Sequence, residues 1–253
     1  MSKLALRVEG LSKSFAGQSI VSDLNFQIPA GAITGLVGFN GAGKSTTLKC
    51  LLGIVLPDRG SVYFFDTHPL AEVKKEIGYL PERPQLPEFL NSHEFLKHHW
   101  NLSLNSENFA DNFEEAASVV LKKVGLCEVR FKSLRTFSKG MKQRIGIAQA
   151  LLRKPKLLFL DEPFSGLDLE GRFFLRTLLK ELKLAGVTIV FTSHSVSEMI
   201  ELCDNILVLN KGRIAFKGAL KDFLNLSNEA MAKALAEFYS IEAQFLQKLG
   251  LNE

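Results

Sequence analysis

Residues 38–46 read GFNGAGKST, and they join an apolar segment rich in β-forming residues (AITGLV, 32–37) to a segment of helical character (TLKCLLGIV, 47–55). The stretch fits the pattern G-x-x-x-x-G-K-[ST]. Glycines in such a turn let backbone N–H groups surround phosphate oxygens, while the lysine reaches the terminal phosphates and the hydroxyl binds Mg²⁺. The sequence therefore predicts a phosphate-binding loop between a strand and a helix. The residues that we expect to contact nucleotide in this loop are Gly38, Phe39, Asn40, Gly41, Ala42, Gly43, Lys44, Ser45 and Thr46.

A second group of polar residues follows an apolar strand later in the chain. Residues 157–160 (LLFL) read as a buried strand whose carboxyl end delivers Asp161 and Glu162. Asp161 suits a Mg²⁺ ligand, as does the Ser45 hydroxyl, and Glu162 suits a general base or a water-orienting group. A guanine-specific enzyme would carry N-K-x-D, whereas the nearest match, NKGR at 210–213, ends in arginine. Guanine specificity therefore has no support in the sequence.

Composition and charge narrow the class of protein. The 253 residues are 46% hydrophobic and 23% charged, and the net charge of +4 gives little support for nucleic acid or anionic lipid as a partner. No apolar run approaches the roughly 18 residues that a membrane span needs, and the N-terminus has no signal-peptide core. The cysteines lack metal-site spacing and fit a reducing compartment. We expect a soluble protein, or one that a partner holds at a membrane.

The order of the expected elements indicates an α/β fold. Residues 4–10 and 19–31 alternate like two antiparallel strands, and strands and helices alternate again from residue 156 onward. We predict one domain over 1–225, with an N-terminal antiparallel β-subdomain and a helical subdomain inserted at about 82–156 between two parts of a parallel sheet. Apolar residues at helical spacing predict a helical tail over 226–253, which packs on its own domain or binds a partner.

Several further motifs resemble the ATP-binding subunits of ABC transporters. RTFSKGMKQRIGIAQALL (135–152) resembles the family's signature loop and helix, FSGLD (164–168) its D-loop, and FTSHSVSEM (191–199) its switch-histidine loop. Phe15 stands where the family has an aromatic residue that stacks on adenine. The resemblance covers nearly the whole chain. It implies a P-loop NTPase of the ABC ATPase type that binds ATP with Mg²⁺ and hydrolyses it.

The mechanism of this family gives the matching residues their roles. Two ATPase subunits meet head to tail, and each ATP lies between one subunit's phosphate-binding loop and the partner's signature loop. By this resemblance Ser138 and Gly140 face the partner's γ-phosphate, and Asp168 communicates across the dimer. His194 contacts the γ-phosphate on its own side, beside the water that Glu162 polarises. The implied catalytic residues are Lys44, Glu162 and His194.

Two positions depart from the family pattern. The signature segment reads FSKGM instead of LSGGQ, so Lys139 adds a cation near a phosphate and Met141 lacks a side-chain amide. Glu82, in IGYLPERP (77–84), stands where most members have a glutamine. Its carboxylate can meet Mg²⁺ or water, while its charge repels phosphate. Both variants resemble the branch whose membrane partner is a separate ABC-2-type permease, mostly in exporters.

Basic residues gather between Glu128 and Asp161, where the sequence has no acidic residue. They bracket the signature segment, so we expect part of the run to supply positive potential to a triphosphate. The rest forms a solvated face or lies near anionic lipid headgroups. The residues of this basic run are Arg130, Lys132, Arg135, Lys139, Lys142, Arg144, Arg153, Lys154 and Lys156.

The expected function is to power a membrane ABC transporter, of ABC-2 exporter type, through ATP-driven dimerisation. The expected partners are separate permease subunits and a second copy of the chain, without nucleic acid. The expected location is cytoplasmic, peripheral on the inner face of the cell membrane. The alternative is a soluble ABC-type ATPase that acts on a nucleic-acid or ribosomal partner. Such proteins carry a long coiled-coil insertion or two fused ATPase domains, and the sequence has one ATPase set and no heptad run.

Overall fold

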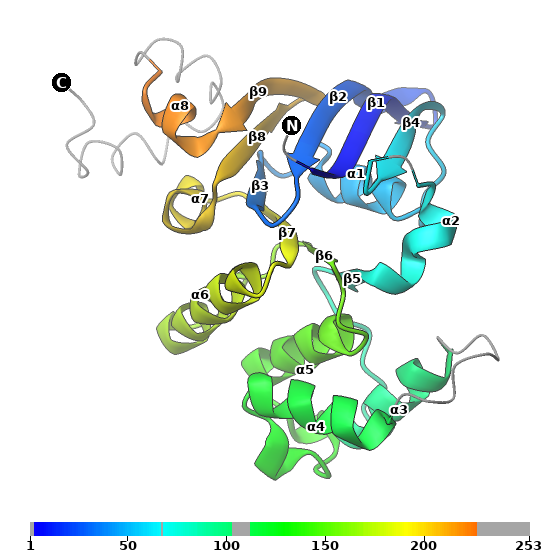
Figure 1. The fold of residues 1–253 in the computed structure, drawn as a ribbon, viewed down its shortest axis with the longest axis vertical. Helices are drawn as coiled ribbons and strands as arrows, with labels where there is room; N and C mark the ends of the chain where they lie inside the picture. Colours follow the sequence, from blue (N-terminus) through cyan, green and yellow to red (C-terminus); the bar gives the residue numbers. More distant parts are fainter. Residues whose placement is uncertain (1–2, 67, 103–111, 227–253) are drawn as a thin grey trace. The chain divides into compact units, whose positions relative to one another are not determined.

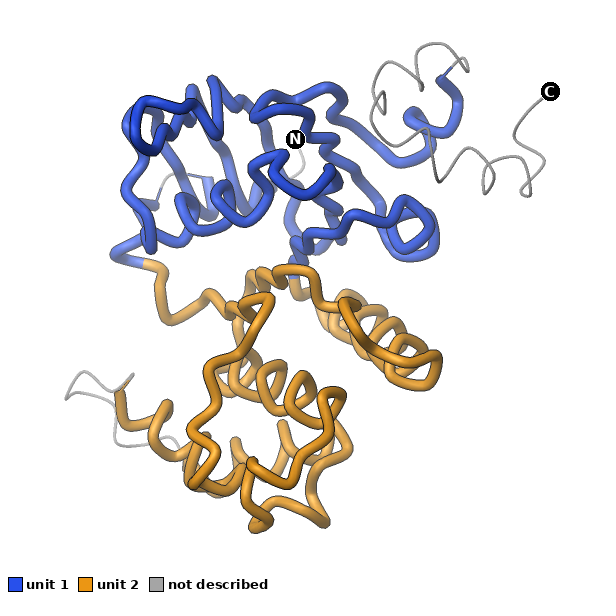
Figure 2. The backbone as a smooth tube through the Cα atoms, turned by 180° about the vertical axis from the view of Figure 1, so that it is seen from behind, with its two compact units in different colours: residues 1–72, 188–253 blue, residues 73–187 orange. Residues whose placement is uncertain are grey.

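The computed structural model describes residues 3–66, 68–102 and 112–226 (Figure 1). The chain divides into two compact units (Figure 2): the first unit is residues 1–72 with 188–253, and the second unit is residues 73–187. Both units combine strands with helices, which confirms the predicted α/β class. The predicted tail at 226–253 lies outside the described residues, apart from Leu226. Within the described ranges, no helix has the length and apolar composition needed to cross a membrane.

The first unit contains an antiparallel sheet with the strand order β2-β1-β4. β1 (Leu4–Phe15) and β2 (Gln18–Pro29) form the predicted hairpin, and β4 (Arg59–Phe64) pairs with the other edge of β1. Ala16 and Gly17 form the turn with φ values of 48° and 81°, a backbone that matches the twist of paired strands. Buried and exposed residues alternate along the second half of β2, so one face of this sheet packs on the core.

The first unit also holds strands in the order β7-β3-β8-β9. β3 (Ile33–Val37) pairs in parallel with β7 (Thr188–Ser193) and with β8 (Asn205–Asn210), while β9 (Arg213–Ala219) runs antiparallel to β8. Every residue of β3 and β7 is buried, as expected for parallel strands that are covered on both faces. The helices of this unit are α1 (Lys44–Leu51), α7 (Val196–Leu202) and α8 (Leu220–Leu224).

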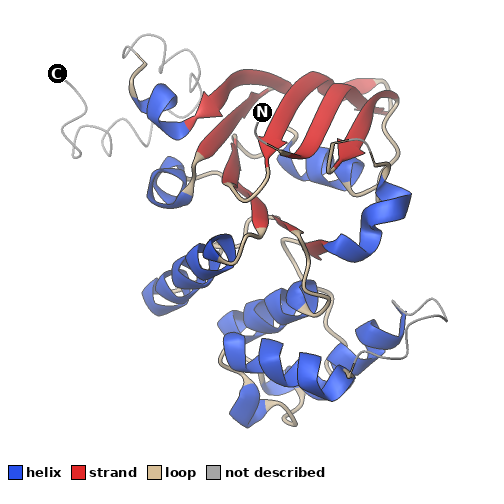
Figure 3. Cartoon of the chain, viewed as in Figure 1, coloured by secondary structure: helices blue, strands red, loops and turns tan. Residues whose placement is uncertain are grey.

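The second unit is dominated by helices (Figure 3). Its strands β5 (Ile77–Leu80) and β6 (Leu157–Leu160) pair in parallel. Between them, the described residues form α3 (Ser92–Leu102), α4 (Phe113–Lys123), α5 (Lys139–Leu151) and short 3₁₀ turns, and α6 (Leu169–Leu184) follows β6. The short helix α2 (Leu70–Val73) and a 3₁₀ turn (Lys74–Glu76) connect β4 to β5 along the chain. The assignment of 82–156 as an inserted subdomain stays a prediction.

Gly60 at the start of β4 allows β4 to approach β1 closely. Its φ is +98°, and a Cβ on this residue would lie 2.6 Å from backbone atoms of Gly10 and Leu11. We expect Gly60→Ala to lower the free energy of unfolding by more than the ~1–3 kcal/mol that a strained backbone conformation alone costs, because a backbone clash is added.

Gly17→Ala is the matched control for this variant. Gly17 also has a positive φ, of +81°, but a Cβ there would meet no heavy atom within 4 Å. Chemical denaturation of both variants separates the conformational cost from the clash. Equal losses in the two variants would show that the close approach at Gly60 contributes nothing to stability.

Candidate nucleotide site

The glycine-rich loop begins where β3 ends and is held tightly by neighbouring strands. A Cβ on Gly38 would lie 2.6 Å from the carbonyl oxygen of Leu209, and one on Gly43 would lie 2.8 Å from that of Ile20. Gly43 also has a φ of 102° and is the N-cap of α1. Only glycine fits these two positions, so the loop backbone lies close against β8 and β2.

Lys44 lies inside the loop and not on the surface. Its side chain is only 6% exposed, and its Nζ donates hydrogen bonds to the carbonyls of Gly38 (2.6 Å) and Phe39 (3.3 Å). Ser45 and Thr46 follow in the first turn of α1 and are half-buried. The loop thus combines a buried ammonium with the amino end of a helix, and both favour an anion at this position.

His194 follows β7 at the same edge of the sheet. In the parallel register Ser193 is paired with Val37, so the next residues along the two strands, His194 and Gly38, both begin loops at this edge. The His194 side chain is exposed. The structure therefore brings His194 to the side of the sheet from which the phosphate-binding loop starts.

Phe15 ends β1 at the hairpin turn and is 48% exposed. Its strand partner is Gln18, and two residues further along β2 the carbonyl of Ile20 touches Gly43. Lys13 Nζ lies 5.3 Å from the centre of the Phe15 ring. The hairpin thus presents an exposed aromatic residue at the end of β1, beside the strand β2 that lies against the loop.

The predicted carboxylates lie in the second unit. Asp161 is 2% exposed, and its N–H donates to the carbonyl of Leu80 at 2.9 Å, which fixes it at the carboxyl ends of β5 and β6. Glu162 is 9% exposed and has a φ of 47°, a conformation that costs a non-glycine residue energy. Glu82 follows β5 and is exposed.

Tyr79 is a neighbour of these carboxylates that the sequence reasoning missed. Burial, together with the negative charges of Asp161 and Glu82, raises the pKa of Tyr79 to about 12. The signal in the sequence was its position in β5, immediately before the turn that carries Glu82. The raised pKa keeps the Tyr79 phenol protonated well above neutral pH.

The signature segment forms the amino end of α5. Ser138 is its N-cap, and the hydroxyl oxygen accepts a hydrogen bond from the N–H of Met141 at 3.2 Å. Gln143 Nε2 donates to the carbonyl of Pro163 at 3.2 Å, and a Cβ on Gly166 would collide with the Lys139 ammonium. Two side chains of α5 therefore contact the loop that follows Glu162.

Asp168 ends that loop as the N-cap of α6. Its Oδ1 accepts a hydrogen bond from the N–H of Gly171 at 2.8 Å. A capping carboxylate of this kind stabilises its own helix, so Asp168 has a local structural role in addition to the predicted role across a dimer.

Much of the basic run is engaged in local structure. Lys142 donates to Glu88 at 2.8 Å, and this hydrogen bond lowers the pKa of the Glu88 carboxyl. Arg153 lies 3.8 Å from the centre of the Trp100 ring and donates to the Trp100 carbonyl. Further contacts of this kind join Arg144 to Phe174, Arg130 to Cys127, and Lys156 to Glu76. Only a part of the run therefore remains available to supply potential to a phosphate.

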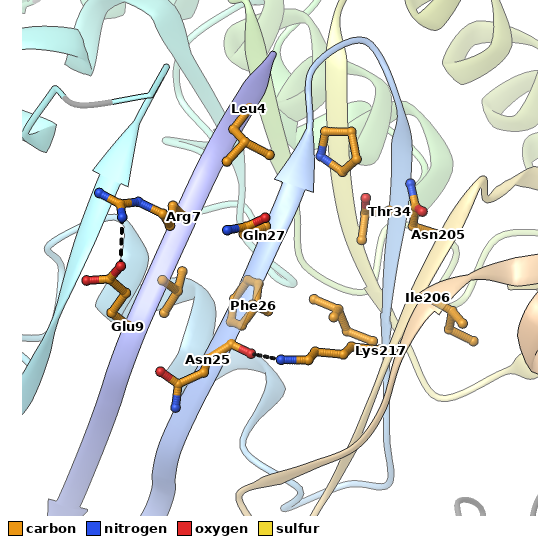
Figure 4. Close-up of a pocket in the computed structure, with 14 residues that line it drawn as sticks. Leu4, Arg7, Glu9, Asn25, Phe26, Gln27, Thr34, Asn205, Ile206 and Lys217 are labelled. Atoms are coloured by element: carbon orange, nitrogen blue, oxygen red, sulfur yellow. Dashed lines mark hydrogen bonds and ion pairs between the residues drawn. The ribbon is translucent and has the colours of Figure 1, made fainter. Parts of the chain in front are cut away.

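A cavity of about 560 Å³ lies elsewhere in the first unit, between β1, β2 and the strands β3, β8 and β9 (Figure 4). Among the described residues that line it, none is a predicted nucleotide contact. Its cations already have partners, since Arg7 pairs with Glu9 at 2.8 Å and Lys217 donates to the Asn25 carbonyl at 2.8 Å. The candidate nucleotide residues thus lie outside this cavity.

The predicted residues are divided between the two units. Phe15, residues 38–46 and His194 lie in the first unit, whereas Glu82, Ser138, Gly140, Asp161 and Glu162 lie in the second. Their roles remain predictions.

Comparison with known proteins agrees with these motifs. Residues 21–165 match the family described as ABC transporter. The chain is 43% identical over 209 residues to an uncharacterized ABC transporter ATP-binding protein, all4389, of Nostoc sp. (strain PCC 7120 / SAG 25.82 / UTEX 2576), which covers 78% of this chain and 59% of that relative. It is 37% identical to the lantibiotic transport ATP-binding protein SrtF of Streptococcus pyogenes, over 83% of this chain and 88% of that one. A solved ATP-binding subunit of an ABC transporter superposes with a TM-score of 0.79 at 31% identity, over 91% of this chain and 99% of that one. The chain belongs to the family of ABC transporter ATP-binding proteins.

Proposed function

We propose that this chain binds and hydrolyses ATP to power a membrane transporter of the ABC-2 exporter type. The observation that carries the proposal is the loop of residues 38–43 closed on the buried Lys44 ammonium, with His194 starting from the same sheet edge. A buried cation at a helix amino end suits the terminal phosphates of a nucleotide. The SrtF relative, named for lantibiotic transport, supports transport as the process that the ATPase drives.

The nucleotide would lie on the first unit. The amides of residues 38–46 and the Lys44 ammonium would hold the phosphates, and the exposed Phe15 ring would stack on adenine. The residues that would bind Mg²⁺ are Ser45 of the first unit and Asp161 and Glu82 of the second, because hydroxyl and carboxylate oxygens are ligands that this ion accepts. When bound, Mg²⁺ would neutralise part of the phosphate charge.

Glu162 would take the proton of the attacking water, and His194 would contact the γ-phosphate. Glu162 is 9% exposed and sits in the left-handed region at φ 47°. Strained backbone at such a position persists only where surrounding structure enforces it, and here the N–H of Ser165 donates to the Glu162 carbonyl at 3.0 Å. This hydrogen bond holds the backbone of Glu162 just beyond the carboxyl end of the buried strand β6.

A second copy of the chain would complete each nucleotide site. Ser138 and Gly140 would face the partner's γ-phosphate from the amino end of α5, whose first turn contains basic but no acidic residues in the sequence. Separate permease subunits would be the membrane partners, and the chain would bind them from the cytoplasmic face. This proposal includes the predicted domain over 1–225 with its helical insertion.

Glu162→Gln tests the proposed base. The amide keeps the shape of the side chain but cannot accept a proton at neutral pH, so we expect ATP turnover to fall by about 10²–10⁴-fold. It also removes a negative charge near the γ-phosphate, so ATP binding should be retained. ATP would then hold two copies together, and gel filtration with ATP should show a dimer.

Two substitutions at Ser138 test how the copies meet. Adding Ser138→Arg to Glu162→Gln should return the trapped dimer to monomer, because a long side chain blocks the contact with the partner's phosphate. Ser138→Ala is the comparison variant, since it removes the hydroxyl, whose cap on α5 is worth about 1 kcal/mol, without the steric block that arginine adds. A trapped dimer that persists with Ser138→Arg, or wild-type turnover by Glu162→Gln, would contradict the proposal.

Phe15→Ala tests the adenine contact. Loss of base–aromatic stacking should weaken ATP binding by about 1–3 kcal/mol, as measured by calorimetric titration. Phe89→Ala is the matched control, because Phe89 is 84% exposed and lies outside the predicted contacts. Unchanged affinity in Phe15→Ala would remove this ring from the site.

A further inference from the structure

The buried hydroxyl of Ser193 makes hydrogen bonds that hold the backbone on both sides of His194. Ser193 Oγ accepts a hydrogen bond from the N–H of Ser195 at 2.9 Å and donates one to Glu198 Oε2 at 2.6 Å. Ser193 and Glu198 are 1% and 4% exposed, whereas His194 between them in the chain is exposed. Hydrogen bonds to a carboxylate are strong and are stronger still away from water.

The local sequence predicts a simpler arrangement at this place. Residues 195–198 read SVSE, the capping-box pattern in which the glutamate accepts a hydrogen bond directly from the N–H of the N-cap serine. Ser195 is indeed the N-cap of α7, but its side chain makes no cap hydrogen bond. Its hydroxyl pairs with that of Ser197 at 2.7 Å. The hydroxyl of Ser193 instead relays the contact from the Ser195 N–H to Glu198.

This relay links the end of β7 to the start of α7. Ser193 is paired in the sheet with Val37, and Val37 is the residue immediately before the glycine-rich loop. The N–H of Ser195 is hydrogen-bonded to the Ser193 hydroxyl, and that hydroxyl is hydrogen-bonded to Glu198 of α7. Both chain neighbours of His194 are therefore fixed relative to the strand that carries the loop, while His194 itself is exposed.

We infer that Ser193 and Glu198 are positioning residues that set the place of the His194 imidazole for contact with the γ-phosphate. This inference rests on the proposed function. Neither residue needs to touch the nucleotide, because both act on the backbone of the turn. Misplacement of a reacting or stabilising group by about 1 Å can cost up to ~100-fold in rate.

The test compares Ser193→Ala with Ser193→Thr in the full chain. Ser193→Ala should lower kcat for Mg-ATP hydrolysis by about tenfold or more and leave the Kd for ATP within about twofold, because the phosphate-binding loop is intact. Ser193→Thr restores a hydroxyl and should regain most of the rate. Ser197→Ala is the matched control, as its hydroxyl contacts Ser195 outside the relay, and it should keep the wild-type rate.

Glu198 provides a second pair of variants in case Ser193→Ala does not fold by circular dichroism. Glu198→Gln keeps an oxygen acceptor for the Ser193 hydroxyl, whereas Glu198→Leu removes it at similar volume. A loss of kcat in the leucine variant, with most of the rate kept in the glutamine variant, supports the relay. Equal rates in both variants and in the wild type would overturn it.

A mutant cycle with His194→Ala separates this inference from the proposed function. If the relay acts through the imidazole, Ser193→Ala should cause no further loss in single-turnover rate when His194 is already alanine. A full additional loss would overturn the positioning role. A wild-type rate in His194→Ala would instead remove His194 from the proposed mechanism, whereas a slow His194→Ala with an unaffected Ser193→Ala would refute the relay alone.

Discussion

The buried ammonium of Lys44 imposes the strictest condition on the first unit. Removing such a group from water costs several kcal/mol unless it is well paired, and here the partners are backbone carbonyls of Gly38 and Phe39. Those carbonyls reach the ammonium only because the loop turns back sharply on α1. This turn requires glycine at positions 38 and 43, where the backbone lies close to the carbonyls of Leu209 and Ile20. The placement of one charge thus determines how β2, β3 and β8 must lie around the loop.

The corresponding condition in the second unit is the burial of two carboxyl groups directly after strand β6. Asp161 and Glu162 are both buried, and burial together with the charges of Asp161 and Glu82 raises the pKa of the Tyr79 phenol to about 12. Carboxylates gathered at a strand end are costly without a counter-charge. The surroundings of Asp161 and Glu162 therefore have to supply groups that offset this cost.

The sequence predicted the parts of the structure that local patterns encode. The loop spacing located Lys44, and the apolar runs located β6 and β7, so Asp161, Glu162 and His194 were found as strand-end residues. The family of the chain follows from the comparisons, and the catalytic and metal-binding roles of these three residues remain predictions. The partners of the basic run were not predictable, because Trp100 and Glu88 are far from Arg153 and Lys142 in the chain. Such pairs depend on how α3, α4 and α5 pack, and helical periodicity does not specify which side chains meet across helices.

The contact between Lys139 and Gly166 limits how this chain can vary. A side chain at 166 would occupy the space that the Lys139 stem now fills, and the φ of +68° at Gly166 already disfavours other residues. With glycine at 139, as in the commoner signature, that space would be empty and the loop after Glu162 would lose a support. With lysine at 139, a side chain at 166 would have to displace the flexible end of the Lys139 side chain. Bringing a lysine to position 139 of a related chain should therefore disturb the D-loop least where glycine stands at 166.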